Sequence, residues 1–353
     1  MIIYGLLVAI ILLAKLLLDI KRLSKLQYCI LIGVAFALVT GLRGVGVGAD
    51  TTVYYLGYEA VKRIDTLALL YESCENDFGY FLFTWLLGKL GAPFWVVTLS
   101  VSAFFYFSIS RIIYKFSEDA CLSYLLLMAF NFFQFSMTGI RQTIAFSFAL
   151  LVLYDVYNKK LKLIKTIILI LLGSWFHLSC LIALLLIPIA LTKKPSTSIG
   201  SLLTIAVLVL GFFFRSYLVT FILELSKDTR FNEFTVENSG GGLTTYLVYF
   251  ALYILGLIYY NKYCENFQKG QVDFKILFLG ILFLGLVPVQ SVLFRLAWYF
   301  SIILIIYLPR LLNTLNIKEQ AFMQPMIYAA VLYMYFFITK SSAAVLPYSF
   351  FWN

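Results

Sequence analysis

The sequence predicts an all-α integral membrane protein, a polytopic helical bundle of about 12 transmembrane spans, from its apolar content, scarce charge and hydropathy. Hydrophobic residues make up 62% of the 353-residue chain, charged residues only 12%, and the mean hydropathy is +0.94. In an ordinary soluble domain roughly a quarter of the residues are charged. We therefore expect a single polytopic membrane domain over residues 1–353, with its helices buried in lipid and against one another.

The expected spans follow from length, because a helix needs about 20 apolar residues to cross a bilayer. The runs 161–174 and 178–191 are short, so we expect a broken or re-entrant pair there. Residues 78–91 form another short apolar stretch, which we expect to dip into the outer leaflet or to lie on it. The expected spans are 3–18, 27–42, 93–113, 121–139, 142–157, 161–174, 178–191, 199–222, 243–260, 274–290, 292–309 and 321–339.

The sequence argues against several other classes of protein and site. No signal peptide is expected, because the basic residues follow the first apolar run instead of preceding it. The five cysteines are scattered and form no CxxC pair, which indicates neither a disulfide framework nor a metal site. P-loop, HExxH and Ser-His-Asp patterns are absent as well. We expect no metal and no cofactor.

Lysine and arginine predict the orientation, since cytoplasmic loops carry an excess of them. Basic clusters follow the first, third, fifth, seventh, ninth and eleventh expected spans. Both termini and the two long loops, 43–77 and 224–242, are therefore expected outside. With each charge assigned to its nearer side, the whole net charge of +10 falls in the cytoplasm. Membrane insertion explains the basic balance, and no nucleic-acid partner is expected.

The stretch 41–55, GLRGVGVGADTTVYY, lies where the second expected span ends. Glycine accepts positive φ and lets a ligand approach the backbone closely. We interpret Arg43, Asp50 and Tyr54, which surround three alternating glycines, as a candidate anion or sugar site at the edge of the membrane. A glycine-rich turn after a helix is common, so this motif gains weight only from the residues described next.

Five polar side chains are expected at the outer membrane boundary, where the rules of insertion do not require them. Arginine binds phosphate through a planar fork and keeps its charge when it is desolvated. Several arginines at one leaflet therefore indicate an anionic headgroup such as a lipid pyrophosphate. The alternative is that each residue is only an interfacial anchor. The five residues are Arg43, Arg141, His177, Arg215 and Arg295.

Two acids at the end of the first outer loop are candidate general bases. Asp77 and Glu75 precede the short helix that is expected to dip, where partial burial can tune a carboxyl group for proton transfer. The alternative is that both are ordinary solvated loop acids. His177 is the next candidate base, because histidine is the side chain whose charge changes nearest to neutral pH.

Five short motifs follow one another between residues 43 and 309. They are Arg43-Gly44 with Val47-Gly48-Ala49-Asp50 and Tyr54; Gly79-Tyr80 after an acid; Ile140-Arg141-Gln142 with Ala145; Phe176-His177-Leu178-Ser179; and Arg295 with Tyr299-Phe300 and Pro309. In this order they resemble the RG..VG.D...Y, E.GY, IRQ..A, FH.S and R...YF...P elements of the EpsG/Wzy-type polysaccharide polymerases of O-antigen, capsule and exopolysaccharide repeat units. One departure is Asp77, which stands where the family usually has Glu. Since Glu75 is a near neighbour, either acid can hold the family's role.

The resemblance implies a GT-C-like glycosyltransferase of the bacterial cytoplasmic (inner) membrane that joins undecaprenyl-pyrophosphate-linked oligosaccharide repeat units on the outer, periplasmic or external face. The growing chain would leave undecaprenyl pyrophosphate and pass to a sugar hydroxyl of the next lipid-linked unit. The implied partners are this lipid-linked oligosaccharide, the lipid bilayer, a chain-length regulator and a flippase. Topology and resemblance together give Asp77, Glu75 and His177 as catalytic candidates, and Arg43, Asp50, Tyr54, Arg141, Gln142, Arg215 and Arg295 as ligands of pyrophosphate or sugar.

Two other functions stay open at this stage. A glycan ligase would also take its donor from a lipid carrier and would differ only in its acceptor. A transporter or flippase of lipid-linked sugars would need charged cavities open to both leaflets. The polar residues of this chain gather on the expected outer side, which disfavours a transporter.

Overall fold

A computed structural model describes residues 2–74, 76–158, 162–192, 198–226, 242–290, 293–340 and 342–353. All regular structure in these segments is helical, apart from one isolated β-bridge between Arg43 and Phe350. The expected all-α class is therefore confirmed. Glu75 and most of the expected outer loop 224–242 lie outside the described residues. The chain divides into two compact units, residues 1–184 with 317–353 and residues 185–316, which are described one at a time.

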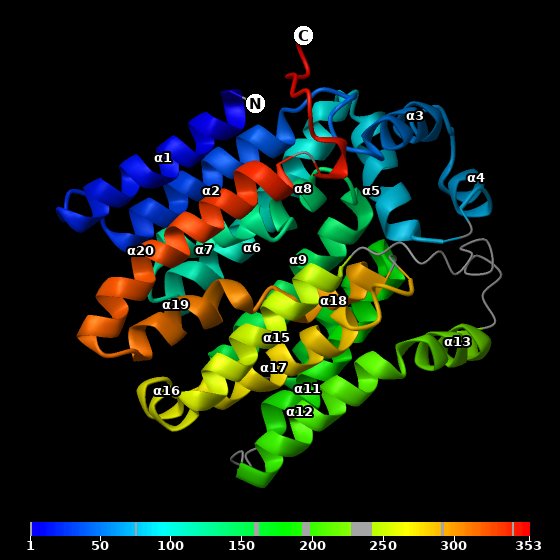
Figure 1. Cartoon of the computed structure of the whole chain (residues 1–353). Helices are drawn as coiled ribbons and strands as arrows, with labels where there is room; N and C mark the ends of the chain where they lie inside the picture. The colour runs from blue at the N-terminus through cyan, green and yellow to red at the C-terminus, as the bar shows by residue number, and fades with distance from the viewer. Residues whose placement is uncertain are drawn as a thin grey trace. The chain divides into compact units, whose positions relative to one another are not determined.

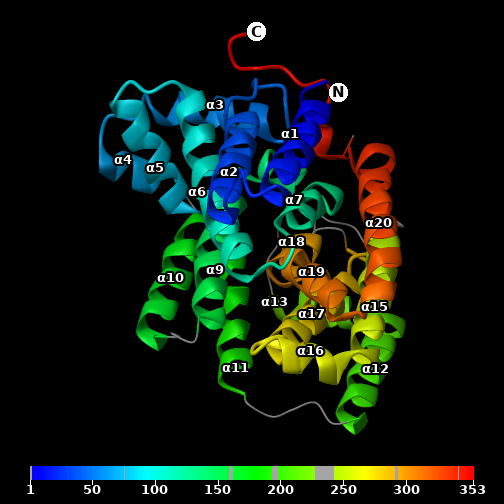
Figure 2. The same cartoon turned by 90° about the vertical axis from the view of Figure 1, so that its left-hand side faces the viewer.

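The first unit is built around α2 (Lys25–Gly41) and α6 (Phe94–Phe116), which pack side by side (Figures 1 and 2). A capping box starts α2: Ser24 accepts from the Gln27 backbone and the Gln27 side chain accepts from the Ser24 backbone. Phe36, fully buried, forms ring contacts of 5.2–5.5 Å with Tyr106, Tyr124 and Phe133. The remaining elements of this unit are α1 (Ile2–Asp19), α3 (Thr51–Val61), α4 (Leu67–Glu72), α5 (Phe78–Lys89), α7 (Ala120–Ala129), α8 (Phe132–Ser136), α9 (Ile140–Tyr157), α10 (Leu163–Phe176), η1 (Leu178–Leu185, which ends at the boundary), α20 (Ile317–Tyr333), η3 (Met334–Thr339) and η4 (Ser342–Ala344).

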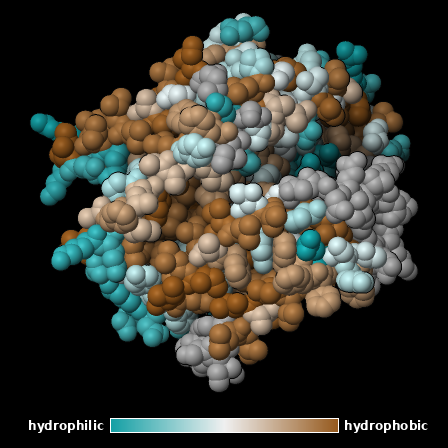
Figure 3. All heavy atoms as spheres, viewed as in Figure 1, coloured by the Kyte–Doolittle hydropathy of each residue, from teal (hydrophilic) through white to brown (hydrophobic). Residues whose placement is uncertain are grey.

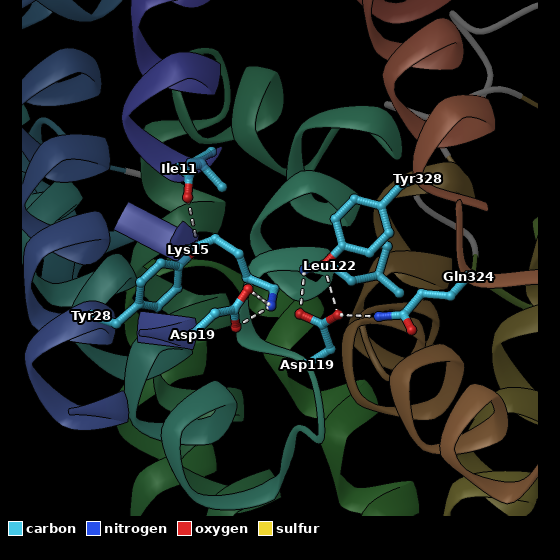
Figure 4. Close-up of polar contacts among 8 residues, drawn as sticks. All are labelled: Ile11, Lys15, Asp19, Tyr28, Asp119, Leu122, Gln324 and Tyr328. Atoms are coloured by element: carbon cyan, nitrogen blue, oxygen red, sulfur yellow. Dashed lines mark hydrogen bonds and ion pairs between the residues drawn. The ribbon is translucent and has the colours of Figure 1, made fainter. Parts of the chain in front are cut away.

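A polar clamp holds the C-terminal helix α20 against α7 (Figure 4). Asp119 caps α7 by accepting from the Leu122 backbone at 3.1 Å. Its other carboxylate oxygen accepts from the Tyr328 hydroxyl at 2.6 Å and from the Gln324 amide at 3.3 Å. The Asp119 carboxylate thus caps the start of α7 and connects this helix to α20, which lies about 200 residues later in the sequence.

The second unit is built around α17 (Gly270–Leu284), which packs against α15, α16, α18, α11 and α12. A buried ion pair lies within it: Arg310 contacts the Asp273 carboxylate at 2.8 Å, and the Tyr263 hydroxyl donates to the same oxygen at 2.6 Å. A buried pair of this kind stays favourable only when further hydrogen bonds support it. The other helices are α11 (Leu186–Leu191), α12 (Ser198–Phe213), α13 (Arg215–Ser226), α15 (Leu243–Ile258), α16 (Tyr260–Asn266), α18 (Phe294–Ser301) and α19 (Leu304–Thr314).

Membrane spans can be counted by length and composition among the described residues. Three helices, α1, α6 and α9, are long and apolar enough to cross a membrane, and the count rises to six if each bent helix pair is one span. In Figure 3, apolar side chains cover much of the visible surface, while hydrophilic ones gather over the turn between α1 and α2. The chain is thus a helical membrane protein, and the number of twelve spans stays a prediction. Each expected span contains helix, but several are short or bent, as at the 75° break after Phe213.

Candidate active site

Arg43 lies just after α2 and is buried, with 3% of its surface exposed. Its guanidinium donates to three backbone carbonyls: Nη2 to Met137 at 2.9 Å, Nε to Val47 at 3.3 Å and Nη1 to Thr40. Burial lowers the pKa of Arg43 to about 10, so the side chain stays protonated at neutral pH. This arginine therefore ties its own loop to the turn before α9.

The glycine-rich loop is packed against the protein's own chain at two of its three glycines. Gly48 has a φ of +99°, and a Cβ there would collide with the Met137 carbonyl oxygen. A Cβ at Gly44 would lie 2.5 Å from the Ser349 hydroxyl. Only Gly46 faces open space. The close approach that glycine allows here is thus to backbone and to the C-terminal segment, whereas the sequence led us to expect a ligand.

The C-terminal segment 343–351 forms the second wall of this loop. Gly44 donates to the Ser349 carbonyl at 2.8 Å, and Gly48 to the Ala344 carbonyl at 3.0 Å. The Phe351 amide returns a bond to the Leu42 carbonyl at 3.0 Å. Both ends of the chain meet at this end of the first unit (Figure 1). The two segments expected on the outer side therefore lie together, and the side of the membrane that they face stays a prediction.

Asp77 and Arg141 form the ion pair at the centre of the candidate site. Arg141 Nη1 lies 2.8 Å from Asp77 Oδ2, and the side chains are 35% and 14% exposed. Arg141 stands at the start of α9, four residues after Met137, whose carbonyl Arg43 binds. Asp77 precedes α5 in the left-handed conformation, with φ 56° and ψ 36°. A non-glycine residue there carries a cost of about 1–3 kcal/mol, which is common at functional sites.

Two tyrosine rings lie next to the ion pair. The Arg141 guanidinium lies 5.7 Å from the Tyr54 ring centroid, and the Tyr54 ring meets the Tyr80 ring edge to face at 5.6 Å. Both rings belong to an aromatic cluster that also contains Ile140 and Phe176. Three of the sequence motifs, those of Tyr54, of Asp77 with Tyr80 and of Arg141, therefore meet at one place.

The fourth motif, that of His177, joins them through α10. A Cβ at Gly79 would lie 2.9 Å from the Trp175 carbonyl oxygen, so the start of α5 and the end of α10 touch through backbone. His177 itself caps α10, and its Nδ1 accepts from the Ser179 amide at 3.2 Å and lies 2.7 Å from the Ser179 hydroxyl. Because Nδ1 is an acceptor, the proton of the neutral ring is assigned to Nε2.

The remaining candidates lie in different surroundings. Asp50 is half-buried before α3 and makes no capping bond, while Gln142 is buried on α9. Arg215 and Arg295 belong to the second unit. Arg215 donates to the Phe212 carbonyl at 2.7 Å and lies over the ring of that residue, and Arg295 is exposed on α18. Glu75 lies outside the described residues, so Asp77 is the acid whose contacts are known.

Sequence reasoning missed two parts of this site. The Tyr80 side chain was interpreted only as part of a motif. Its position three residues after Asp77, about one helical turn, was a usable signal that the two lie on the same side of α5. No local pattern marked the C-terminal segment as a partner of the glycine loop, because more than 290 residues of sequence separate the two.

Comparisons with known proteins identify the family of the chain. The model of the EpsG family, a Wzy-type polymerase-like family, matches residues 25–350. No curated protein and no solved structure was found to match the chain. The matched region contains all four clustered motifs and the fifth motif at Arg295. Since this match covers nearly the whole chain, the protein belongs to the EpsG family.

Proposed function

We propose that this protein is a polysaccharide polymerase, a glycosyltransferase that joins undecaprenyl-pyrophosphate-linked oligosaccharide repeat units on the outer face of the cytoplasmic membrane. The observation that carries this proposal is the 2.8 Å ion pair between Asp77 and Arg141. It places a carboxylate and a guanidinium from two family motifs side by side. A glycosyl transfer from a pyrophosphate needs these two groups, a base for the acceptor and a cation for the leaving group.

The proposed reaction has one bond forming and one breaking. A sugar hydroxyl of the incoming unit attacks the anomeric carbon of the growing chain, and the bond from that carbon to the pyrophosphate oxygen breaks. Asp77 takes the hydroxyl proton, and undecaprenyl pyrophosphate leaves with the bonding electrons. Asp77 Oδ2 is held by Arg141, while Oδ1 has no hydrogen-bond partner among the described residues. Oδ1 is therefore the oxygen proposed to accept the proton.

Arg141 has the position and the exposure to stabilise the leaving group. Negative charge grows on the pyrophosphate as the glycosyl bond breaks, and a guanidinium that binds it more strongly in the transition state lowers the barrier. A hydrogen bond to a charged group contributes about 1.5–3 kcal/mol. Loss of one such bond is expected to slow turnover about 10–100-fold.

His177 is better suited to donate a hydrogen bond than to act as a base. Its Nδ1 is already an acceptor for the Ser179 amide, which leaves the proton on Nε2. We propose that Nε2–H serves the pyrophosphate or a sugar oxygen. Arg43 is proposed to position Arg141 through the Met137 carbonyl. Arg295 and Arg215 stay proposed pyrophosphate ligands, to be tested by the same substitutions as Arg141.

The test is the chain-length profile of glycan made by a strain that lacks the gene and carries variants of it. Asp77→Asn is expected to give single repeat units without a ladder at unchanged protein level, because loss of a general base costs about 10²–10⁴-fold. Arg141→Lys should give short ladders and Arg141→Ala almost none. Glu59→Gln is the matched control and should give wild-type ladders, since Glu59 of α3 forms its ion pair with Lys62, the residue that follows this helix.

Each alternative function predicts a different profile. If the protein were a ligase, its inactive variants would leave long chains on the lipid carrier. If it were a flippase, its inactive variants would abolish even single exported units. A normal ladder from Asp77→Asn would remove Asp77 from the role of base. Wild-type ladders from Arg141→Lys would mean that its planar fork has no part in the reaction, as the interfacial-anchor interpretation predicts.

A further inference from the structure

The hydroxyl of Tyr80 is a buried polar atom without a partner. Tyr80 is 4% exposed, and its Oη makes no hydrogen bond to any residue that the structure describes. Burying a hydroxyl in this way costs free energy, and native proteins keep few such atoms. The neighbouring Tyr58 shows the usual solution, because its hydroxyl donates to the Ala92 carbonyl. The orphaned hydroxyl therefore needs an explanation of its own.

A second unpartnered atom lies in the same neighbourhood. Arg141 Nε is buried and has no hydrogen-bond acceptor in the described part of the chain, although Nη1 of the same guanidinium is bound to Asp77. The positive charges of Arg141 and Arg43 both act on the Tyr80 hydroxyl. The Tyr54 ring contacts both Tyr80 and Arg141. Two buried polar groups thus lie beside one aromatic ring, that of Tyr54.

We propose that the Tyr80 hydroxyl and Arg141 Nε–H form a two-donor subsite for one anionic oxygen of the substrate. Nε–H can only donate, and a tyrosine hydroxyl beside an arginine is better placed to donate than to accept. An oxygen that accepts from both satisfies both atoms at once, and a negative one gains from the adjacent guanidinium. The class of ligand is a phosphate or carboxylate oxygen, which the pyrophosphate of the lipid carrier or an acidic sugar can supply.

This subsite deepens the proposed function and rests on it. Arg141 would hold Asp77 with Nη1 and the anionic oxygen with Nε, so that a single rigid guanidinium fixes the distance between base and leaving group. The planar fork makes such shared positioning possible, and lysine cannot reproduce it. Tyr80 would add a neutral donor, which strengthens binding without placing a second charge beside Arg141.

The experiment compares Tyr80→Phe with Tyr58→Phe in the full-length protein held in lipid nanodiscs. Both variants remove only a hydroxyl from a buried ring of the same aromatic cluster. The probes are undecaprenyl pyrophosphate and free glucuronate, and the readouts are the Kd of each probe and the Tm without ligand. We expect Tyr80→Phe to weaken binding of undecaprenyl pyrophosphate about 10–100-fold and to leave the Tm equal or higher, because an unsatisfied polar atom is removed. Tyr58→Phe should leave the Kd unchanged and lower the Tm.

The possible outcomes separate this inference from the proposed function. Weaker binding of glucuronate alone would support the subsite and assign it to a sugar carboxylate. A second outcome is that the wild-type protein binds undecaprenyl pyrophosphate and that Tyr80→Phe leaves the Kd of both probes unchanged. This result would overturn the subsite and leave the proposed function standing. Failure of the wild-type protein to bind undecaprenyl pyrophosphate would count against the proposed function itself. A lower Tm for Tyr80→Phe with an unchanged Kd would assign the hydroxyl to the fold and also overturn the subsite.

Discussion

Replacing Arg43 separates a structural role from contact with substrate. The side chain is buried and its three donors serve the carbonyls of Thr40, Val47 and Met137. Arg43→Ala removes these bonds and leaves the carbonyls without their partner. Arg43→Lys keeps a charge but offers one ammonium group, which cannot span three separate carbonyls in the geometry of a planar fork.

The magnitude follows from those bonds. Three hydrogen bonds from a charged donor contribute about 1.5 kcal/mol each at the low end, and burying the guanidinium itself costs part of that sum. We expect a net loss of about 2–4 kcal/mol for Arg43→Ala, and about half of that for Arg43→Lys. With about 2 °C of Tm per kcal/mol for a chain of this size, the Tm should fall by about 4–8 °C for alanine.

The assay is the Tm of the full-length protein in nanodiscs, measured beside the glycan ladder of the same variant. Arg63→Ala is the control, because Arg63 is an exposed arginine of the same unit and surface substitutions usually change stability by less than about 0.5 kcal/mol. In the Arg43 variants, polymer length and Tm should fall together. In the Arg141 variants, polymer length should fall while the Tm stays unchanged. An Arg43→Ala protein with a wild-type Tm and no polymer would refute the structural role and make Arg43 a substrate ligand.

Two further predictions concern the packing of α5 and the orientation of the chain. Gly79→Ala should reduce polymer length and lower the Tm, since its Cβ would lie 2.9 Å from the Trp175 carbonyl oxygen. Gly57→Ala is the control and should be stable and active, because no atom of the described residues lies within 4 Å of its Cβ. Equal behaviour of the two variants would contradict the contact between Gly79 and Trp175. Reporter fusions at Gly241 and Asn353 should read external, and a fusion in the lysine-rich loop after the fifth expected span should read cytoplasmic. A cytoplasmic Gly241 would invalidate the predicted orientation.

The sequence by itself determined the class of the protein and its family. Composition alone requires a membrane environment, because an apolar content of 62% exceeds what a soluble core can bury. The order of five short motifs was enough to identify the EpsG family, which the match over residues 25–350 confirms. Helices were found in every expected span, but their breaks were not anticipated in most. A bend after Phe213 or Tyr259 leaves the apolar pattern unchanged, so hydropathy does not reveal it.

Only the tertiary structure decided how the motifs are used. Sequence order could not show that Asp77 meets Arg141, because 63 residues and four helices, α5 to α8, lie between them. It could not show that Arg43 faces backbone carbonyls, since an arginine beside glycines reads equally well as a ligand site. The orphaned hydroxyl of Tyr80 was also invisible, because satisfaction of a polar atom depends on every group around it.

The physical reason is the difference between local and long-range information. Apolar length, capping residues and charge bias act along the chain, so they can be read in order. The site is made of side chains that burial in a shared aromatic cluster brings together. Its geometry depends on close contacts such as Gly79 with Trp175 and Gly44 with Ser349, each of which joins segments that no periodicity in the sequence connects.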